Sequence, residues 1–263
     1  MEPIRVVING ALGKMGREIV NSLSQEPDVQ IVGAAELKVS GDSLPLPNGS
    51  TVPFSTNLEA IITKCKPQVI VDFTTAKAVM PMVRTATKHG VNVVIGTTGL
   101  TPDDIKEIES LANAHGVGAV VASNFALGAV MMIHLAKIAA KYFDYAEIIE
   151  LHHHRKADAP SGTALSTARA MAQVKGRTFS QSAEQAKPAD SRGGKVEGIA
   201  IHSVRLPGLL AHQEVLLGTS GQTLSIRHDT ISRECYMPGI ILAVKEIIKR
   251  KGLVYGLDKL LGL

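Results

Sequence analysis

The segment from Glu150 to Ala164 concentrates residues that can transfer protons and bind anions. It is written ELHHHRKADAPSGTA, with three consecutive histidines, then Lys156, then a Ser-Gly-Thr triplet. Histidine acts as a general acid near neutral pH because its ordinary pKa is about 6.5. We therefore expect a histidine or lysine of this segment to supply a proton to a bound substrate.

The triplet Ser161, Gly162 and Thr163 lies where a helix is predicted to begin, because alanine and leucine recur at helical spacing over Thr163–Val174. The first backbone N–H groups of a helix have no partner inside it and bind carboxylates well. Gly162 permits close approach of an anion, and Lys156 adds a positive charge. The sequence therefore predicts a site for a small dicarboxylate substrate.

The same residues admit other interpretations. Consecutive histidines can bind Zn²⁺, but structural zinc sites use spaced ligands with cysteine or histidine partners, and no second ligand cluster is evident in the sequence. The three histidines can also have a purely structural role, and Asp158 can cap the following helix instead of taking part in chemistry. We predict no metal site.

The turn Gly10-Ala11-Leu12-Gly13-Lys14-Met15-Gly16 is a second candidate site. Glycines allow a tight turn and close approach of the backbone to phosphate, and a helix N-terminus attracts the pyrophosphate of a dinucleotide. The spacing is GxxGxxG rather than the usual GxGxxG, so a glycine-rich turn in a fold that binds no nucleotide is the alternative.

Two residues near the end of the second predicted strand bear on the cofactor. Glu36 follows Gly16 by 20 residues, where an acidic residue can accept the ribose hydroxyls of the adenosine. Lys38 either receives a 2′-phosphate or is an ordinary solvated lysine. Both NADH and NADPH therefore remain candidates.

Strand-like and helix-like segments alternate through the first half of the chain, which indicates a doubly wound parallel sheet with helices on both faces. Small or polar residues follow four of the strands, and the carboxyl ends of such strands form the ligand crevice. The predicted strands are Arg5–Asn9, Gln30–Glu36, Val69–Phe73, Asn92–Ile95 and Ala119–Ala122, and the predicted helices are Gly13–Ser24, Leu58–Lys64, Ala76–His89 and Pro102–His115.

The second half has a different pattern, which predicts an α+β domain on a mostly antiparallel sheet after residue 123. A polar loop, Ser180–Gly198, precedes three strand-like runs that we expect to form a meander. These runs offer more apolar surface than the adjacent helices can cover, which favours an oligomer interface. The predicted elements are the helices Leu127–Tyr142, Thr163–Val174 and Gly239–Lys249 and the strands Ala146–Leu151, Ile199–Arg205, Gln213–Leu217 and Thr223–Arg227.

Composition excludes several classes of protein. Of the 263 residues 45% are hydrophobic and 20% charged, which is sufficient for a packed core. Aromatic residues are only 3%, the net charge is +4, and no concentrated basic stripe or helix-turn-helix signal is present, so we expect no nucleic-acid partner. The sequence shows neither a signal peptide nor a membrane span, which predicts a cytoplasmic protein.

Five motifs together resemble dihydrodipicolinate reductases: GxxGxMG, VDFT, GTTG, SNF and ELHHHRKADAPSGTA. The resemblance covers the whole chain and implies reduction of 4-hydroxy-tetrahydrodipicolinate to tetrahydrodipicolinate in lysine and diaminopimelate biosynthesis. It implies a Rossmann-like dinucleotide-binding domain of residues 1–123 and 233–263, and a substrate-binding and oligomerisation domain of residues 124–232. It also implies a homotetramer.

The resemblance assigns roles to individual residues. His152 would be the proton donor and acceptor, Lys156 the second catalytic residue, and the substrate would be bound by His153, Ser161, Gly162 and Thr163. It gives His154 no task. The NADH or NADPH site would be formed by Gly10, Ala11, Leu12, Gly13, Lys14, Met15, Glu36, Lys38, Gly96, Thr97, Thr98, Ala122, Ser123, Asn124 and Phe125.

Two departures and two competing functions accompany the resemblance. Leu12 stands where the family often has glycine, and Lys38 lies near a position where some members carry arginine. A different Rossmann-type dehydrogenase would lack the dicarboxylate site, and a redox sensor that binds NAD(H) would need a partner surface or a DNA-binding element.

Overall fold

The computed structural model describes residues 2–181 and 191–263, and the chain forms two compact units. One contains Met1–Leu127 together with Arg233–Leu263, and the other contains Gly128–Ser232. The chain therefore leaves the first unit four residues later than the predicted boundary at 123 and returns to it at residue 233. Within the described residues, no helix is long and apolar enough to cross a membrane.

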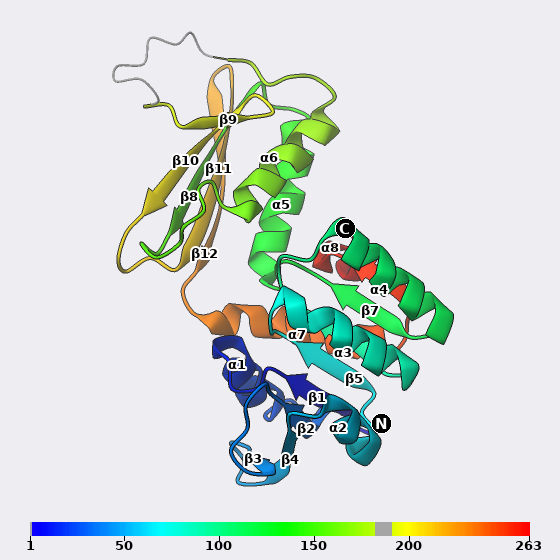
Figure 1. The fold of residues 1–263 in the computed structure, drawn as a ribbon. Coiled ribbons are helices and arrows are strands. Elements are labelled where there is room, and N and C mark those ends of the chain that lie inside the picture. Colours follow the sequence, from blue (N-terminus) through cyan, green and yellow to red (C-terminus); the bar gives the residue numbers. More distant parts are fainter. Residues whose placement is uncertain (1, 182–190) are drawn as a thin grey trace. The chain divides into compact units, whose positions relative to one another are not determined.

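The first unit is built around a sheet of eight strands (Figure 1). The strands are β1 (Ile4–Asn9), β2 (Val29–Ala35), β3 (Ser43–Pro45), β4 (Thr51–Ser55), β5 (Val69–Asp72), β6 (Asn92–Ile95), β7 (Gly118–Val121) and β13 (Gly252–Tyr255). The helices are α1 (Lys14–Leu23), α2 (Leu58–Cys65), α3 (Ala76–Lys88), α4 (Pro102–His115), α7 (Met237–Ile247) and α8 (Leu257–Leu261), with a short 3-10 helix, η1, at Arg233–Tyr236. The order is β13-β7-β6-β5-β1-β2-β4-β3, and only β3 and β4 pair antiparallel.

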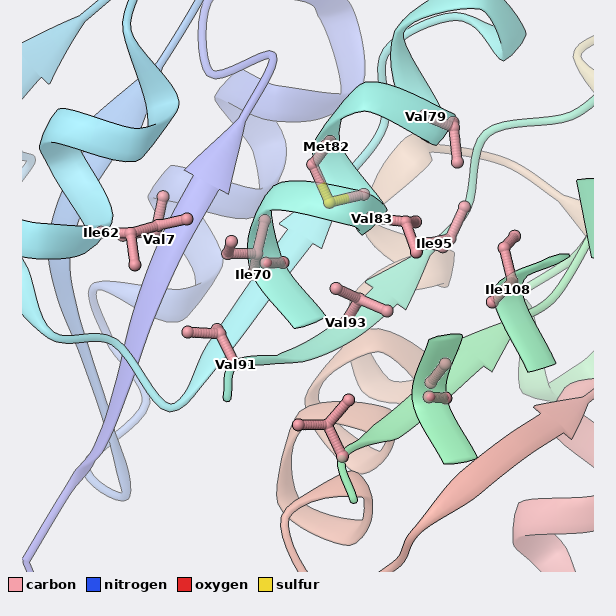
Figure 2. Packing of buried hydrophobic residues seen from close by; sticks show 14 of the residues in the cluster. Val7, Ile62, Ile70, Val79, Met82, Val83, Val91, Val93, Ile95 and Ile108 are labelled. Atoms are coloured by element: carbon pink, nitrogen blue, oxygen red, sulfur yellow. The ribbon is translucent and has the colours of Figure 1, made fainter. Parts of the chain in front are cut away.

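The central strands carry mainly apolar side chains because helices cover both faces of the sheet. On one face, Val7, Ile70 and Val93 pack against α2, α3 and α4, and Figure 2 shows Val79 and Met82 of α3 in this cluster. The side chains that alternate with them on the strands point to the opposite face, where α1 and α7 contact the sheet. The predicted doubly wound sheet is confirmed.

The prediction missed five elements of this unit, among them the short helix η1. β3 and β4 form a small antiparallel ribbon within the stretch rich in proline and glycine. Proline is tolerated there because the ribbon lies at the sheet edge. β13 extends the opposite edge by parallel pairing with β7, and α8 follows it in the leucine-rich tail. These strands form through pairing partners that are distant in sequence or contain proline, so periodicity alone did not indicate them.

The second unit has a five-stranded sheet with two helices on one face (Figure 1). Its elements are α5 (Leu127–Ala140), β8 (Tyr145–His152), α6 (Gly162–Lys175), β9 (Gly194–Val196), β10 (Ile199–Arg205), β11 (Ala211–Thr219) and β12 (Gln222–Thr230). The core lies between helices and sheet and includes Met132, Ile148, Met171, Ile201 and Val215. Of the predicted Ser180–Gly198 loop, residues 182–190 lie outside the described residues, and β9 occupies its end.

The order of this sheet is β12-β11-β8-β10-β9. β8 and β10 pair in parallel and the other neighbours are antiparallel, so the predicted mixed, mostly antiparallel sheet is confirmed. The expected meander is wrong in one respect, because β8 lies between β10 and β11. The five residues 206–210 connect β10 to the far side of β8, whereas a hairpin would have paired β10 with β11 directly.

Candidate active site

The glycine-rich turn joins β1 to α1 in the first unit. Gly10 has a φ of 85°, and its N–H donates to the carbonyl of Ala35 at 2.9 Å. A Cβ at Gly16 would lie only 2.0 Å from the carbonyl oxygen of Gly10, so the helix packs directly onto the turn and requires glycine there. The N–H of Ala11 also points to Ala35, at 3.4 Å, so these two donors are used within the sheet.

The start of α1 is the part of this turn that offers donors to an anion. Gly13 is the N-cap and supplies no side-chain acceptor, and no acidic residue lies in the first turn. The backbone N–H groups of Lys14 and Met15 therefore lie at the positive end of the helix dipole, and no acidic side chain of the first turn neutralises that end. This arrangement fits a pyrophosphate, and it places the anion donors at the helix start rather than at the beginning of the turn.

Glu36 follows β2 beside the same turn. Its carboxylate accepts the N–H of Leu12 at 3.1 Å and that of Leu37 at 2.9 Å, which fixes its position. Lys38 is exposed in the loop that follows. Glu36 is thus the better placed of the two to contact an adenosine ribose.

A pocket of about 980 Å³ lies next to Gly10 and Glu36. Its walls also include residues that follow β5, where the sequence predicted a ligand crevice, and residues from the start of α2 and from one face of α3, which the sequence did not indicate. These wall residues are Thr56, Asn57, Leu58, Glu59, Phe73, Thr74, Thr75, Lys77, Ala78, Pro81, Met82 and Thr85. Lys38 is outside the lining. The size of the pocket and its ribose acceptor fit the adenosine half of a dinucleotide.

Asp72, at the end of β5, connects the loops around this region. Its buried carboxylate accepts the hydroxyl of Thr97 at 2.7 Å, the amide of Asn9 at 2.6 Å and the hydroxyl of Thr74 at 3.0 Å. Burial raises the pKa of Asp72, although these hydrogen bonds oppose the shift. The hydroxyl of Thr97 is therefore committed to the loop and is not directed to a ligand.

The remaining predicted cofactor residues follow β6 and β7. A Cβ at Gly96 would lie 2.1 Å from the ring of Phe73, which itself stacks at an angle on Phe125 with centroids 5.5 Å apart. Thr98 and Ser123 are exposed. Ala122 is buried, and its N–H donates to the carbonyl of Ile95 in β6. The side chain of Asn124 accepts the N–H of Ala126 at 2.9 Å.

In the second unit, β8 ends with Glu150 and His152 on the same face. The Nδ1 atom of His152 lies 2.5 Å from Oε2 of Glu150. Arg205 of β10 binds the same carboxylate with both terminal nitrogens, at 2.9 and 2.8 Å. The parallel register between β8 and β10 places Arg205 opposite His152, which explains how residues far apart in sequence meet.

Glu150 is ionised despite its complete burial. Burial would raise its pKa, but hydrogen bonds from His152, Arg205 and Ser203 outweigh that effect and lower the pKa to about 2. The carboxylate is therefore an acceptor only. A ring nitrogen facing it must donate, so the geometry assigns the proton on Nδ1 of His152 and directs Nε2 away from Glu150.

The residues after His152 have different environments. His153 is partly buried, and burial lowers its pKa, as do the nearby positive charges of His152 and Arg155. His154 is exposed. Lys156 donates to both carboxylate oxygens of Asp158, at 2.7 and 2.8 Å, so Asp158 pairs with the lysine and does not cap the helix.

The start of α6 has the predicted donors, with one correction. The hydroxyl of Ser161 caps the helix by accepting the N–H of Ala164 at 3.2 Å, and its own N–H donates to Glu150 at 3.3 Å. Ser161 is thus buried, and its hydroxyl and its N–H both have hydrogen-bond partners within the protein. Gly162 is exposed with open space where a Cβ would be, so Gly162 and Thr163 are left to bind a carboxylate.

Three buried polar atoms near this segment have no hydrogen-bond partner within the described residues: Nδ1 of His153, Nε of Arg205 and Oε1 of Gln213. Gln213 of β11 lies opposite Glu150 and donates to Thr167 of α6 at 2.9 Å. Unpaired buried polar atoms are costly, which favours a polar ligand beside them. The described part of the chain contains no cluster of three or more metal-ligating side chains.

Comparison with known proteins agrees with both halves of this description. The family model described as dihydrodipicolinate reductase, N-terminus, matches residues 4–125, and the one described as dihydrodipicolinate reductase, C-terminus, matches residues 128–261. A 4-hydroxy-tetrahydrodipicolinate reductase of Dehalococcoides mccartyi (strain ATCC BAA-2266 / KCTC 15142 / 195) is 54% identical over 264 residues, with complete coverage of both chains. One from Moorella thermoacetica is 49% identical and covers 98% of each.

The fold has a solved counterpart of the same kind. A dipicolinate-bound dihydrodipicolinate reductase from Paenisporosarcina sp. TG-14 is 40% identical, with a TM-score of 0.88 over 98% of this chain and 99% of that one. Both sequence halves, the full-length relatives and the solved structure therefore agree, and the chain belongs to the dihydrodipicolinate reductase family.

Proposed function

We propose that this chain catalyses the nicotinamide-dependent reduction of 4-hydroxy-tetrahydrodipicolinate to tetrahydrodipicolinate, a step of lysine and diaminopimelate biosynthesis. The observation that carries the proposal is the β8–α6 segment, where His152, Lys156 and the open helix start at Gly162 lie within eleven residues. A relative that is 54% identical over the full length of both chains carries this reductase name.

In the proposed reaction, the bound nicotinamide cofactor supplies the hydride. The N–H groups of Gly162 and Thr163 bind one substrate carboxylate, and Lys156 neutralises its charge once it exchanges Asp158 for the substrate. His152, protonated at both ring nitrogens, donates the proton at Nε2 to the anion that hydride addition leaves, and keeps the proton at Nδ1 for Glu150.

Two assays test this proposal. The purified protein, supplied with freshly generated substrate, should oxidise NADH or NADPH, and pyridine-2,6-dicarboxylate should inhibit it as a planar analogue of the product. The variant His152→Gln should lose about 10²- to 10⁴-fold in kcat with little change in KM, because proton transfer occurs in the transition state. No cofactor oxidation, or no inhibition at millimolar dicarboxylate, would reject the proposal.

For the cofactor, we propose that both nicotinamide dinucleotides are used and that NADH is preferred. The fixed carboxylate of Glu36 suits ribose hydroxyls and repels a 2′-phosphate, whereas Lys38 is exposed and therefore screened by solvent. The ratio of kcat/KM for NADH and NADPH tests this preference. The variant Glu36→Ala should move the ratio toward NADPH, and an unchanged ratio would contradict the role of Glu36.

We also propose a homotetramer, located in the cytoplasm and assembled through the second sheet. The face opposite α5 and α6 presents Ile149, Leu151 and Leu216 beside charged side chains that are paired with one another, including Arg227 and Glu214. Apolar side chains on an uncovered sheet face suit an interface between copies. Light scattering should give four times the 27.9 kDa of the chain, and cell fractionation should recover the protein outside membranes.

A further inference from the structure

Among the described residues of the second unit, Glu150 is the most completely enclosed carboxylate, and the proposed reaction gives it no direct task. It is 0% exposed, and it lies two residues before His152 on the helix-covered face of β8. Burial of an ionised group is expensive unless every oxygen is paired. Its partners therefore show what the fold gains from keeping a charge at this position.

Each oxygen of Glu150 serves a different part of the segment. Oε2 faces the ring of His152 at 2.5 Å, whereas Oε1 accepts the N–H of Ser161 at 3.3 Å, immediately before α6. Arg205 spans both oxygens, and its NH2 also donates to the carbonyl of Asp158 at 2.7 Å. One carboxylate and one guanidinium thus hold the end of β8, the middle of the connecting loop and the start of α6.

We infer that Glu150, held by Arg205, is the positioning residue of this site: it fixes the proton-donating nitrogen of His152 and the helix start that binds the substrate carboxylate. This inference rests on the proposed function for its kinetic consequences, but not for its structural ones. The side chain of Glu150 is completely buried, so its effect on a ligand passes through His152 and Ser161.

The two connections predict two separable kinetic effects. Without the ionised acceptor, the ring of His152 has no partner that holds a proton on Nδ1 while Nε2 gives its proton to the substrate, so kcat should fall. Loss of the Ser161 contact loosens the donors at Gly162 and Thr163, so KM should rise. A carboxylate that only stabilised the fold would instead lower the amount of active protein and leave both constants of the folded fraction unchanged.

The first experiment measures kinetics of Glu150→Gln, His152→Gln and the double variant. The single Glu150→Gln change should lower kcat by at least about 10-fold, within the range that general acid catalysis supplies, and raise KM. In the His152→Gln background it should have little further effect on kcat, because the two residues act as one unit, while the rise in KM persists. Full additivity of the kcat losses would overturn the link to His152.

A matched control exists on the same strand. Glu147 lies on the opposite face of β8 and is also paired with a histidine and an arginine, His202 at 2.8 Å and Arg192. Glu147→Gln should leave kcat within about two-fold of wild type at unchanged oligomeric state. An equal loss in both variants would show that any carboxylate of β8 matters and would overturn the special role of Glu150. Glu150→Asp, which keeps the charge, should recover part of kcat.

The second experiment needs no enzymatic activity, and its only variant is the His152→Gln protein already used for the kinetics. Long-range ¹H–¹⁵N correlation spectra of histidine-labelled wild-type protein report which ring nitrogen of neutral His152 carries the proton, with His152→Gln providing the assignment. We expect Nδ1–H, and an Nε2–H ring would overturn the inference. If the enzyme assay fails while the ring is Nδ1–H, the proposed reaction is wrong and the positioning geometry stands.

Discussion

Two buried carboxylates, Asp72 in the first unit and Glu150 in the second, lie near the ends of strands that lead into the proposed ligand-binding loops. Both side chains are completely buried, and each accepts several hydrogen bonds. Their pKa values nevertheless move in opposite directions. Burial raises the pKa of Asp72, whereas at Glu150 the same effect is outweighed and the pKa falls to about 2.

The charge of the donors accounts for the difference. Asp72 receives its hydrogen bonds from the neutral groups of Asn9, Thr74 and Thr97. Glu150 is bound by the guanidinium of Arg205 and by His152. Neutral donors satisfy the oxygens of a buried carboxylate, but they offset the effect of burial on its pKa less than a cationic donor does. The hydrogen bonds of Asp72 connect neighbouring loops, whereas the ion pair of Glu150 keeps an anion beside the titratable ring of His152.

Substitution of Arg205 is expected to have the largest effect on the free energy of unfolding. Arg205→Met should lower the free energy of unfolding by about 3–5 kcal/mol, because it leaves Glu150 buried without its cation. Arg177→Met is the control, since Arg177 forms an exposed pair with Asp144, and it should cost less than about 1 kcal/mol. Urea unfolding at pH 7 measures both. Similar losses in the two variants would contradict the view that Glu150 depends on a buried counter-charge.

The second largest effect is expected at low pH, where protonation of Glu150 removes its contribution to the free energy of unfolding. Its pKa is 4.5 in the unfolded reference and about 2 when folded, so its stabilisation is complete above pH 4.5 and is lost as the pH falls toward 2. The shift corresponds to roughly 3 kcal/mol. Other carboxylates with lowered pKa values, such as Asp144 and Asp229, titrate in wild type and in Glu150→Gln alike.

The measurement is the difference between the unfolding free energies of wild type and Glu150→Gln, followed from pH 6 to pH 3. This difference should shrink as the pH falls, because the wild type alone loses the contribution of the ionised carboxylate. Parallel curves would mean that Glu150 is no more acidic when folded than when unfolded.

A smaller effect is expected at the neutral donors of Asp72. Thr97→Val removes the 2.7 Å hydrogen bond to the buried carboxylate and should cost about 2 kcal/mol. Thr98→Val, at the exposed neighbouring position, should change stability by less than about 0.5 kcal/mol. Thermal and urea unfolding of the pair measure the difference. If Thr97→Val matches Arg205→Met in cost, donor charge is not what separates the two carboxylates.

The sequence predicts the elements of both regions better than their connections. Apolar runs such as Val69–Val71 identify buried strands without knowledge of their neighbours, whereas β13 depends on parallel pairing with a strand more than a hundred residues earlier. Likewise, a spacing of two places Glu150 and His152 on one face of a strand. Nothing in the spacing indicates Arg205, which lies 55 residues after Glu150 and arrives through the register of β10.

The candidate site shows the same limit. The helix start at Gly162 and the lysine were predicted from local chemistry, and the structure places open space at that glycine. Ser161 was also expected to offer a free N–H, but that group donates to Glu150. Local pattern identifies groups that can bind an anion, and only the tertiary arrangement determines which of them are already bound within the protein.

The smallest effect is expected for Asp72→Asn. The raised pKa means that the ionised form of Asp72 costs stability as the pH rises above 3.8, so a neutral amide removes a penalty at pH 7 while its oxygen still accepts the hydroxyl of Thr97. The change in unfolding free energy should stay below about 1 kcal/mol, and it should favour the variant more at pH 7 than at pH 4. Glu150→Gln loses a charge that its neighbours require, so it should be far more destabilising at pH 7. Equal costs for the two amides at pH 7 would show that both sites depend on the negative charge, and the contrast between neutral and cationic donors would no longer explain them.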